Sequence, residues 1–154
     1  GGVKAALHRG RTKLQKQQKT QHEPDIMEPA QQELFEAYLE RFSKKDWDGV
    51  CALLRADARL EVVGLAKGKG EAFFRKGYFR NYSRFEILWR YVLAKVDGVF
   101  MGLQLRQEGG KWVPFTVKSL EWDGEKISNI RDYVHVEYLL EGAEIEVISE
   151  SELY

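Results

Sequence analysis

The sequence has little of what marks secreted, membrane-spanning or disordered proteins. Its 154 residues include one cysteine, Cys51, which has no partner for an internal disulfide, and this fits a reducing cytoplasm. There are only three prolines, no apolar run is long enough to span a bilayer, and no apolar stretch follows the basic start as in a secretion signal. With 44% hydrophobic residues, the chain can bury a core of its own. We therefore expect a cytoplasmic protein with one main folded domain and no membrane contact.

Metal-binding and phosphate-binding motifs are also missing. The three histidines, His8, His22 and His135, are far apart in the sequence and no cysteine pair accompanies them, so we expect no metal site. The glycine-rich stretch 64–70 is one residue too short for a phosphate loop and has Gly70 where a serine or threonine is needed. It is interpreted as a turn between a strand and a helix. We expect no cofactor, and we expect Cys51 to be a free thiol buried in a helix, with a reactive nucleophile as the alternative.

A net charge of zero conceals an uneven distribution of charge. The first 20 residues carry six basic side chains and no acidic one, whereas the stretch from Glu137 onward carries six glutamates and no base. A basic arm is typical of segments that contact phosphate, and a solvated tail is the alternative. Residues 15–28 are polar and rich in glutamine, which predicts a linker.

Three helices are expected between residues 29 and 82. Pro29 suits the first position of a helix, where a missing N–H is not needed, and Asp46 suits the N-cap of a second helix. A short strand, Leu60–Val63, separates the second helix from the third. The residues expected to face inward from the three helices, at helical spacing, are Leu34, Phe35, Tyr38, Leu39, Phe42, Trp47, Val50, Cys51, Leu54, Phe73, Phe74, Tyr78 and Tyr82.

From Arg84 onward the period of the apolar residues changes to two, which predicts strands. Turn sequences at Asp97-Gly98, 108–111 and Asp123-Gly124 divide this part into four strands: 85–93, 99–107, 112–122 and 127–138. The predicted fold class is α+β, with three N-terminal helices packed on a strongly bent antiparallel sheet that forms a cone.

Such a cone is expected to enclose a pocket. The side chains expected to line it are Tyr38, Trp47, Phe74, Tyr78, Trp89, Phe115, Asp132 and Val134. Asp132 shares the inward side of its strand with apolar residues, and burial would raise the pKa of its carboxyl group toward that of a general base. The structural alternative is that Asp132 pairs with an arginine such as Arg90. His135 is expected on the opposite side of the strand, which disfavours a His–Asp dyad, and these residues assign no reaction by themselves.

Residues 3–14 carry a first resemblance to a known family. Their sequence, Val-Lys-Ala-Ala-Leu-His-Arg-Gly-Arg-Thr-Lys-Leu, resembles the end of the recognition helix in region four of extracytoplasmic-function sigma factors of the sigma-70 family. The family pattern is Val-Lys-Ser-x-Leu-His-Arg-x-Arg-x-x-Leu, and Ala5 replaces its serine. The resemblance implies that Lys4, Arg9, Arg11 and Lys13 contact the phosphates of DNA in the parent protein.

The body of the chain, residues 29–145, is similar to the SnoaL-like branch of the nuclear-transport-factor-two-like superfamily. The similarity lies in Ala-Arg-Leu-Glu-Val at 58–62, Tyr-Phe-Arg-Asn-Tyr at 78–82, Ile-Arg-Asp-Tyr at 130–133 and Glu-Gly-Ala-Glu at 141–144. One branch of sigma factors with such an extension has an Asp-Gly-Gly-Gly motif after the first strand of this domain. Here Gly-Leu-Ala-Lys stands at that place.

Together the two resemblances imply the C-terminal part of a sigma factor. It would comprise the end of a region-four helix (1–14), a linker (15–28) and a SnoaL-like domain (29–154). Core RNA polymerase and promoter DNA would bind regions that precede this chain, and the domain would regulate transcription, with a small apolar ligand and a homodimer through the sheet as further expected partners. The alternatives are an isomerase or cyclase that uses Asp132 as general base with Tyr38 or Tyr78 as hydrogen-bond donor, and a structural dimerisation module.

Overall fold

A computed structural model describes residues 27–149 of the chain. The predicted basic helix at 1–14 and most of the predicted linker at 15–28 lie outside the described residues. None of the helices within 27–149 has the length and apolar character needed to cross a membrane.

The helices begin where the sequence predicts them. Helix α2 spans Pro29–Ser43 with Pro29 in its first turn, and α3 spans Trp47–Leu53. The Asp46 side chain caps α3 by accepting a hydrogen bond from the Gly49 N–H at 3.0 Å, which confirms the predicted N-cap. The third helical segment consists of α4 (Glu71–Phe73), the π-helix η1 (Phe74–Phe79) and α5 (Arg80–Ser83), which follow one another without a gap.

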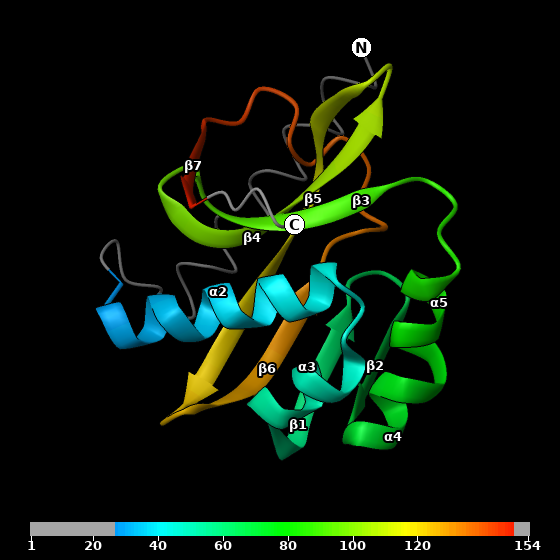
Figure 1. Ribbon diagram of the computed structural model, residues 1–154, viewed down its shortest axis with the longest axis vertical. Helices are drawn as coiled ribbons and strands as arrows, with labels where there is room; N and C mark the ends of the chain where they lie inside the picture. The colour runs from blue at the N-terminus through cyan, green and yellow to red at the C-terminus, as the bar shows by residue number, and fades with distance from the viewer. Residues whose placement is uncertain (1–26, 150–154) are drawn as a thin grey trace.

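Seven strands form one sheet in the order β2-β1-β6-β5-β4-β3-β7. The strands are β1 (Leu54–Val62), β2 (Ala66–Lys69), β3 (Trp89–Val96), β4 (Val99–Glu108), β5 (Lys111–Asp123), β6 (Lys126–Asp132) and β7 (Ile145–Ser149). Strands β1 and β6 pair in parallel and the other neighbours are antiparallel. The sheet bends so strongly that β3 and β4 run across the direction of β1 and β6 (Figure 1).

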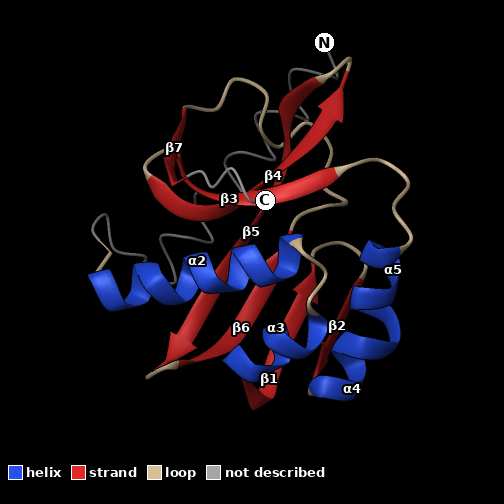
Figure 2. Cartoon of the chain, viewed as in Figure 1, coloured by secondary structure: helices blue, strands red, loops and turns tan. Residues whose placement is uncertain are grey.

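Two apolar layers hold the domain together. On the concave side of the sheet, where the helices lie (Figure 2), the core contains Phe35, Tyr38, Leu39, Phe42, Val50, Leu60, Phe74, Tyr78, Phe79, Tyr82, Tyr91 and Ile130. On the other side, Val92, Met101, Leu103 and Val117 pack against Tyr133 and Leu139, with Val136, Leu140 and Ile145 partly buried beside them. The chain's own residues 133–145 thus cover apolar surface of the outer face. The homodimer through the sheet stays a prediction.

Several predicted boundaries are wrong, and each has a local cause. The first strand begins at Leu54 rather than Leu60, because α3 ends at Leu53 and Leu54 is already extended. The stretch 64–70 contains the strand β2, which pairs with β1 across a tight turn, so it is more than the predicted turn between a strand and a helix.

The strand predicted at 85–93 begins only at Trp89. Ile87 and Leu88 are 52% and 63% exposed, so the alternating pattern before Trp89 reflects an extended loop rather than a strand. The strand predicted at 127–138 ends at Asp132, because the Asp132 carboxylate accepts a hydrogen bond from the Val134 N–H at 2.9 Å and turns the chain away. Strand β7 was not predicted.

Candidate ligand-binding site

A fully buried carboxylate, Asp132, lies at the centre of the concave core, at the end of β6. Its Oδ2 accepts hydrogen bonds from the hydroxyl groups of Tyr78, at 2.5 Å, and Tyr82, at 2.6 Å. Its Oδ1 accepts the Val134 N–H. Both oxygens therefore have donors, as a buried carboxylate requires. Tyr78 comes from η1 and Tyr82 from α5, so the helical segment places both hydroxyl groups on the sheet residue.

A chain of hydrogen bonds extends from Tyr82 across the sheet. The Tyr82 hydroxyl lies 2.7 Å from the Tyr91 hydroxyl, and Gln104 Nε2 donates to the Tyr91 oxygen at 2.9 Å. Because Tyr82 has one hydroxyl proton and gives it to Asp132, Tyr91 must be the donor to Tyr82. Every hydrogen bond in this chain therefore points toward the carboxylate.

A second chain of hydrogen bonds begins at Lys118 on β5, which is also fully buried. Its Nζ donates to the hydroxyl groups of Tyr78, at 2.8 Å, and Tyr38, at 3.1 Å, and lies 3.9 Å from Asp132 Oδ2. The ring centroid of Phe42 is 3.3 Å from the amine. Removal from water lowers the pKa of Lys118 to about 7, although the charge of Asp132 opposes this shift.

The tyrosines of the cluster remain protonated at neutral pH. Burial is the main cause that raises the pKa of Tyr38, Tyr78, Tyr82 and Tyr91 well above the usual value, and the negative charge of Asp132 adds to it. They act as hydrogen-bond donors and not as phenolates.

An apolar pocket of about 760 Å³ opens beside this cluster. One wall is the helical segment α4–η1–α5, and the other is the β1–β2 hairpin together with the residues after β6. The described side chains that line it are Leu60, Val62, Leu65, Ala66, Ala72, Phe73, Lys76, Tyr78, Asn81, Tyr82, Arg84, Phe85, Val134 and His135, with Gly77 between them. Tyr78 and Tyr82 belong both to the pocket and to the cluster. The pocket is thus separated from Asp132 by the two tyrosines that bind the carboxylate.

Comparison with known proteins identifies the fold. No family model matches the sequence, and no curated protein matches it either. Among solved structures, a protein of Shewanella denitrificans OS-217, provisionally named a SnoaL-like polyketide cyclase, superimposes with a TM-score of 0.51 at 13% identity, over 68% of this chain and 90% of that one. The chain has a SnoaL-like fold. This confirms the predicted α+β class.

Other solved structures resemble the SnoaL-like domain less well. A protein of Xanthomonas campestris pv. campestris, provisionally named a polyketide cyclase, has a TM-score of 0.49 at 16% identity, over 66% of this chain and 87% of that one. An LEH-like epoxide hydrolase of M. tuberculosis has a TM-score of 0.47 at 21% identity, over 69% and 84% of the two chains. At such identities the likeness concerns the fold alone, and none of these structures relates the chain to a sigma factor.

The SnoaL-like domain brings some of the predicted pocket residues together and separates others. Tyr78 and Val134 line the pocket, whereas Tyr38, Phe74 and Trp89 are buried in the core beside it. Trp47 is partly buried and stacks on Phe79, with ring centroids 4.6 Å apart.

Phe115 does not belong to this site. Its side chain is 45% exposed and lies under the Arg106 guanidinium, 3.4 Å from the ring centroid. The expectation that Phe115 faces the interior is therefore wrong. Cys51, expected to be buried, is only partly buried.

The partners of Asp132 also differ from those expected. Its cationic neighbour is Lys118 and not Arg90, whose guanidinium lies 4.7 Å from the Trp112 ring. Strand pairing places Lys118 directly opposite Asp132. The signal for Lys118 was present in the sequence, because it shares its side of the strand with Leu120 and Trp122.

His135 lines the pocket, although strand alternation placed it on the opposite side. The alternation fails because β6 ends at Asp132. Among residues 27–149, no group of three or more histidine, cysteine or acidic side chains could hold a metal ion.

Proposed function

We propose that this SnoaL-like domain binds a small, mostly apolar molecule in the pocket between the helical segment and the β1–β2 hairpin. The observation that carries the proposal is the pocket itself: about 760 Å³, with apolar walls, and with Tyr78 and Tyr82 at its floor. Pockets that bind small molecules are typically ~300–1,000 Å³, mainly apolar and equipped with a few fixed polar groups. The two tyrosines are such groups, because Asp132 holds both of them in place.

Replacing Gly77 with leucine is expected to abolish binding. Gly77 lies on η1 in the pocket wall, and a Cβ at this position would meet nothing within 4 Å. A leucine side chain can therefore occupy the pocket without displacing the backbone. We expect the affinity for an uncharged naphthalene ester, methyl 2-naphthoate, to fall by at least about ten-fold, which corresponds to ~1.4 kcal/mol. Fluorescence titration measures it.

Gly77→Ala is the matched control. It removes the same glycine but fills little of the pocket, so the ester should still bind, and the helical segment should be slightly more stable, because a glycine in a helix destabilises it by roughly 0.5–1 kcal/mol. Wild-type affinity in Gly77→Leu, or no binding of the ester by the wild-type protein, would contradict the proposal.

A second candidate function is catalytic, and the contact between Tyr78 and Asp132 favours it. Asp132 cannot touch a ligand, because it is fully buried and both of its oxygens are occupied. The Tyr78 oxygen could instead take a proton from a carbon atom next to a carbonyl group, while the Tyr78 hydroxyl proton passes to Asp132 Oδ2, which lies 2.5 Å from the Tyr78 oxygen. In this isomerase- or cyclase-type step, Asp132 is the final base and Tyr78 the relay.

Deuterium exchange tests this candidate. If the relay operates, the wild-type protein should accelerate exchange at the carbon atoms beside the carbonyl group of 2-tetralone in D2O, followed by NMR, and Tyr78→Phe should reduce the rate to that of buffer. Tyr38→Phe is the control, since Tyr38 is equally buried in the cluster but does not line the pocket. Exchange at the buffer rate with the wild-type protein would refute the catalytic candidate and leave the binding proposal intact.

The role in transcription stays a prediction. It depends on the resemblance of residues 3–14 to a sigma-factor recognition helix, and these residues lie outside the described part of the chain. In that role, the pocket described above would be the place where a small molecule regulates the protein. Such regulation requires that the ligand bind the active and inactive arrangements with different affinities.

A further inference from the structure

The two charged side chains that line the pocket, Lys76 and Arg84, are both basic and lie at its exposed edge, which is called its mouth below. Lys76 on η1 and Arg84 after α5 belong to the helical wall, and the uncharged lining residue His135 comes from the segment after β6. All three are exposed. None of the described side chains that line the pocket is acidic. An apolar cavity with a basic mouth differs from a general hydrophobic pocket, because it discriminates between ligands by charge.

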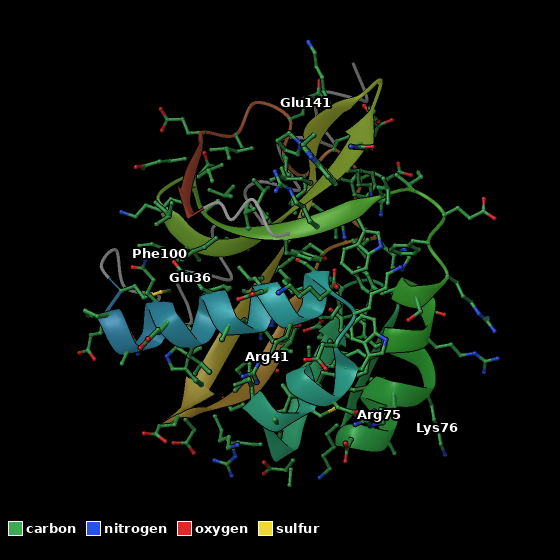
Figure 3. All side chains as sticks on the ribbon, viewed as in Figure 1. Glu36, Arg41, Arg75, Lys76, Phe100 and Glu141 are labelled. Atoms are coloured by element: carbon green, nitrogen blue, oxygen red, sulfur yellow. The ribbon has the colours of Figure 1, made fainter. Side chains whose placement is uncertain are left out.

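Lys76 and Arg84 have no ion-pair partner within residues 27–149. The contrast with the neighbouring residue is direct: Arg75 binds Asp48 at 2.7 Å and Glu71 at 2.9 Å. Figure 3 shows Arg75 directed toward α3 and Lys76 directed away from it. Arg75 is therefore engaged in ion pairs within the fold. Lys76 and Arg84 remain available to a ligand.

We propose that the pocket takes an amphipathic monoanion, an apolar ring or chain that ends in a carboxylate. The apolar body lies against Val62, Phe73 and Phe85, and the carboxylate lies at the mouth near Lys76 and Arg84. This inference rests on the proposed binding function. The orientation follows from the position of Asp132, whose carboxylate beneath the tyrosine floor repels a second negative charge.

Two probe molecules with the same ring system, one anionic and one uncharged, show how much the charge of the ligand contributes to its affinity. 2-Naphthoate and its uncharged methyl ester share the same ring system, and we expect the wild-type protein to bind the acid more tightly than the ester. Salt should weaken binding of the acid alone, because the screening length falls from about 30 Å at ~0.01 M to about 3 Å at ~1 M ionic strength.

Variants at the mouth of the pocket test which basic side chains bind the carboxylate of the acid. Lys76→Gln and Arg84→Gln should each weaken binding of 2-naphthoate by about two- to five-fold, the range of an exposed ion pair, and should weaken binding of the uncharged ester less than that of the acid. Lys67→Gln is the control, since it alters the net charge equally but lies on β2 outside this pocket.

Each outcome supports or overturns the inference. Equal affinity for acid and ester, with no effect of the two variants, would refute the anionic ligand class but leave the binding function standing, provided that Gly77→Leu still abolishes binding of both probes. An equal effect of Lys67→Gln would show that overall charge, and not the mouth, attracts the acid. If the wild-type protein binds neither probe, both the inference and the proposed function fail.

Discussion

Replacing Asp132 with alanine is expected to lower the free energy of unfolding by about 3–5 kcal/mol, the usual loss when one partner of a buried ionic cluster is removed. The substitution leaves the Tyr78 and Tyr82 hydroxyl groups and the Val134 N–H without their acceptor. It also leaves the Lys118 amine without the carboxylate that lies 3.9 Å away. Urea unfolding, followed by tryptophan fluorescence, measures the loss.

Two further variants calibrate this result. Asp123→Ala removes an exposed carboxylate that pairs with Arg55, and such surface pairs contribute about 0–1 kcal/mol. Asp132→Asn keeps one acceptor oxygen but places an amide NH₂ in the cluster, so its loss should fall between those of the two alanine variants. If Asp132→Ala and Asp123→Ala lose the same free energy, the cluster does not stabilise the fold.

Raising the pH from 7 to 9 is expected to stabilise the wild-type protein by about 1 kcal/mol per pH unit. The pKa of Lys118 is about 7 in the folded protein, well below its ordinary value of 10.5 in the unfolded chain. Between these two values the unfolded chain binds more protons than the folded protein, so stability rises with pH. Below pH 7 both states are protonated, and the destabilisation caused by the buried ammonium group is fully present.

Lys118→Met is the variant that tests this slope. Methionine is unbranched and apolar, so it fits among the rings of Phe42 and Tyr91, which contact the amine in the wild-type protein. We expect the dependence of stability on pH between 7 and 9 to disappear in this variant. In Lys67→Met, which removes an exposed amine, the slope should remain. Urea unfolding at three pH values in this window measures it, and an unchanged slope in Lys118→Met would contradict the prediction.

The rise of stability with pH is expected to end near pH 9. Burial raises the pKa of Tyr38, Tyr78, Tyr82 and Tyr91, so above about pH 10 the unfolded chain loses protons that the folded protein keeps. Burial also raises the pKa of Cys51 from its ordinary value of 9.0. These groups lower stability as the pH rises further, and a maximum near pH 9 is therefore expected.

The local signals in the sequence were enough to predict most of the secondary structure. Pro29 and Asp46 mark the starts of α2 and α3, and Asp97-Gly98 and Asp123-Gly124 form the turns between antiparallel strands. The inward position of Asp132 also followed from alternation along its strand. These features depend on the chemistry of a few adjacent residues, which is why the sequence predicts them.

The sequence predicts the ends of the strands less well. Alternation continues past Asp132 and begins before Trp89, although neither stretch belongs to a strand. A pattern of period two shows only that a chain is extended. Whether it pairs depends on a neighbouring strand and, at Asp132, on a side chain that takes the N–H of Val134.

The amino-acid sequence by itself determined the α+β class, the helix caps, the hairpins and the burial of Asp132. Tertiary structure alone decided that Lys118 is opposite Asp132, that Tyr78 and Tyr82 separate this carboxylate from the pocket, and that His135 joins Lys76 and Arg84 at the mouth. The reason is that these contacts join α4–η1–α5 to β5 and β6, segments tens of residues apart. How these segments meet depends on the bend of the whole sheet and not on the residues that adjoin each segment in the sequence.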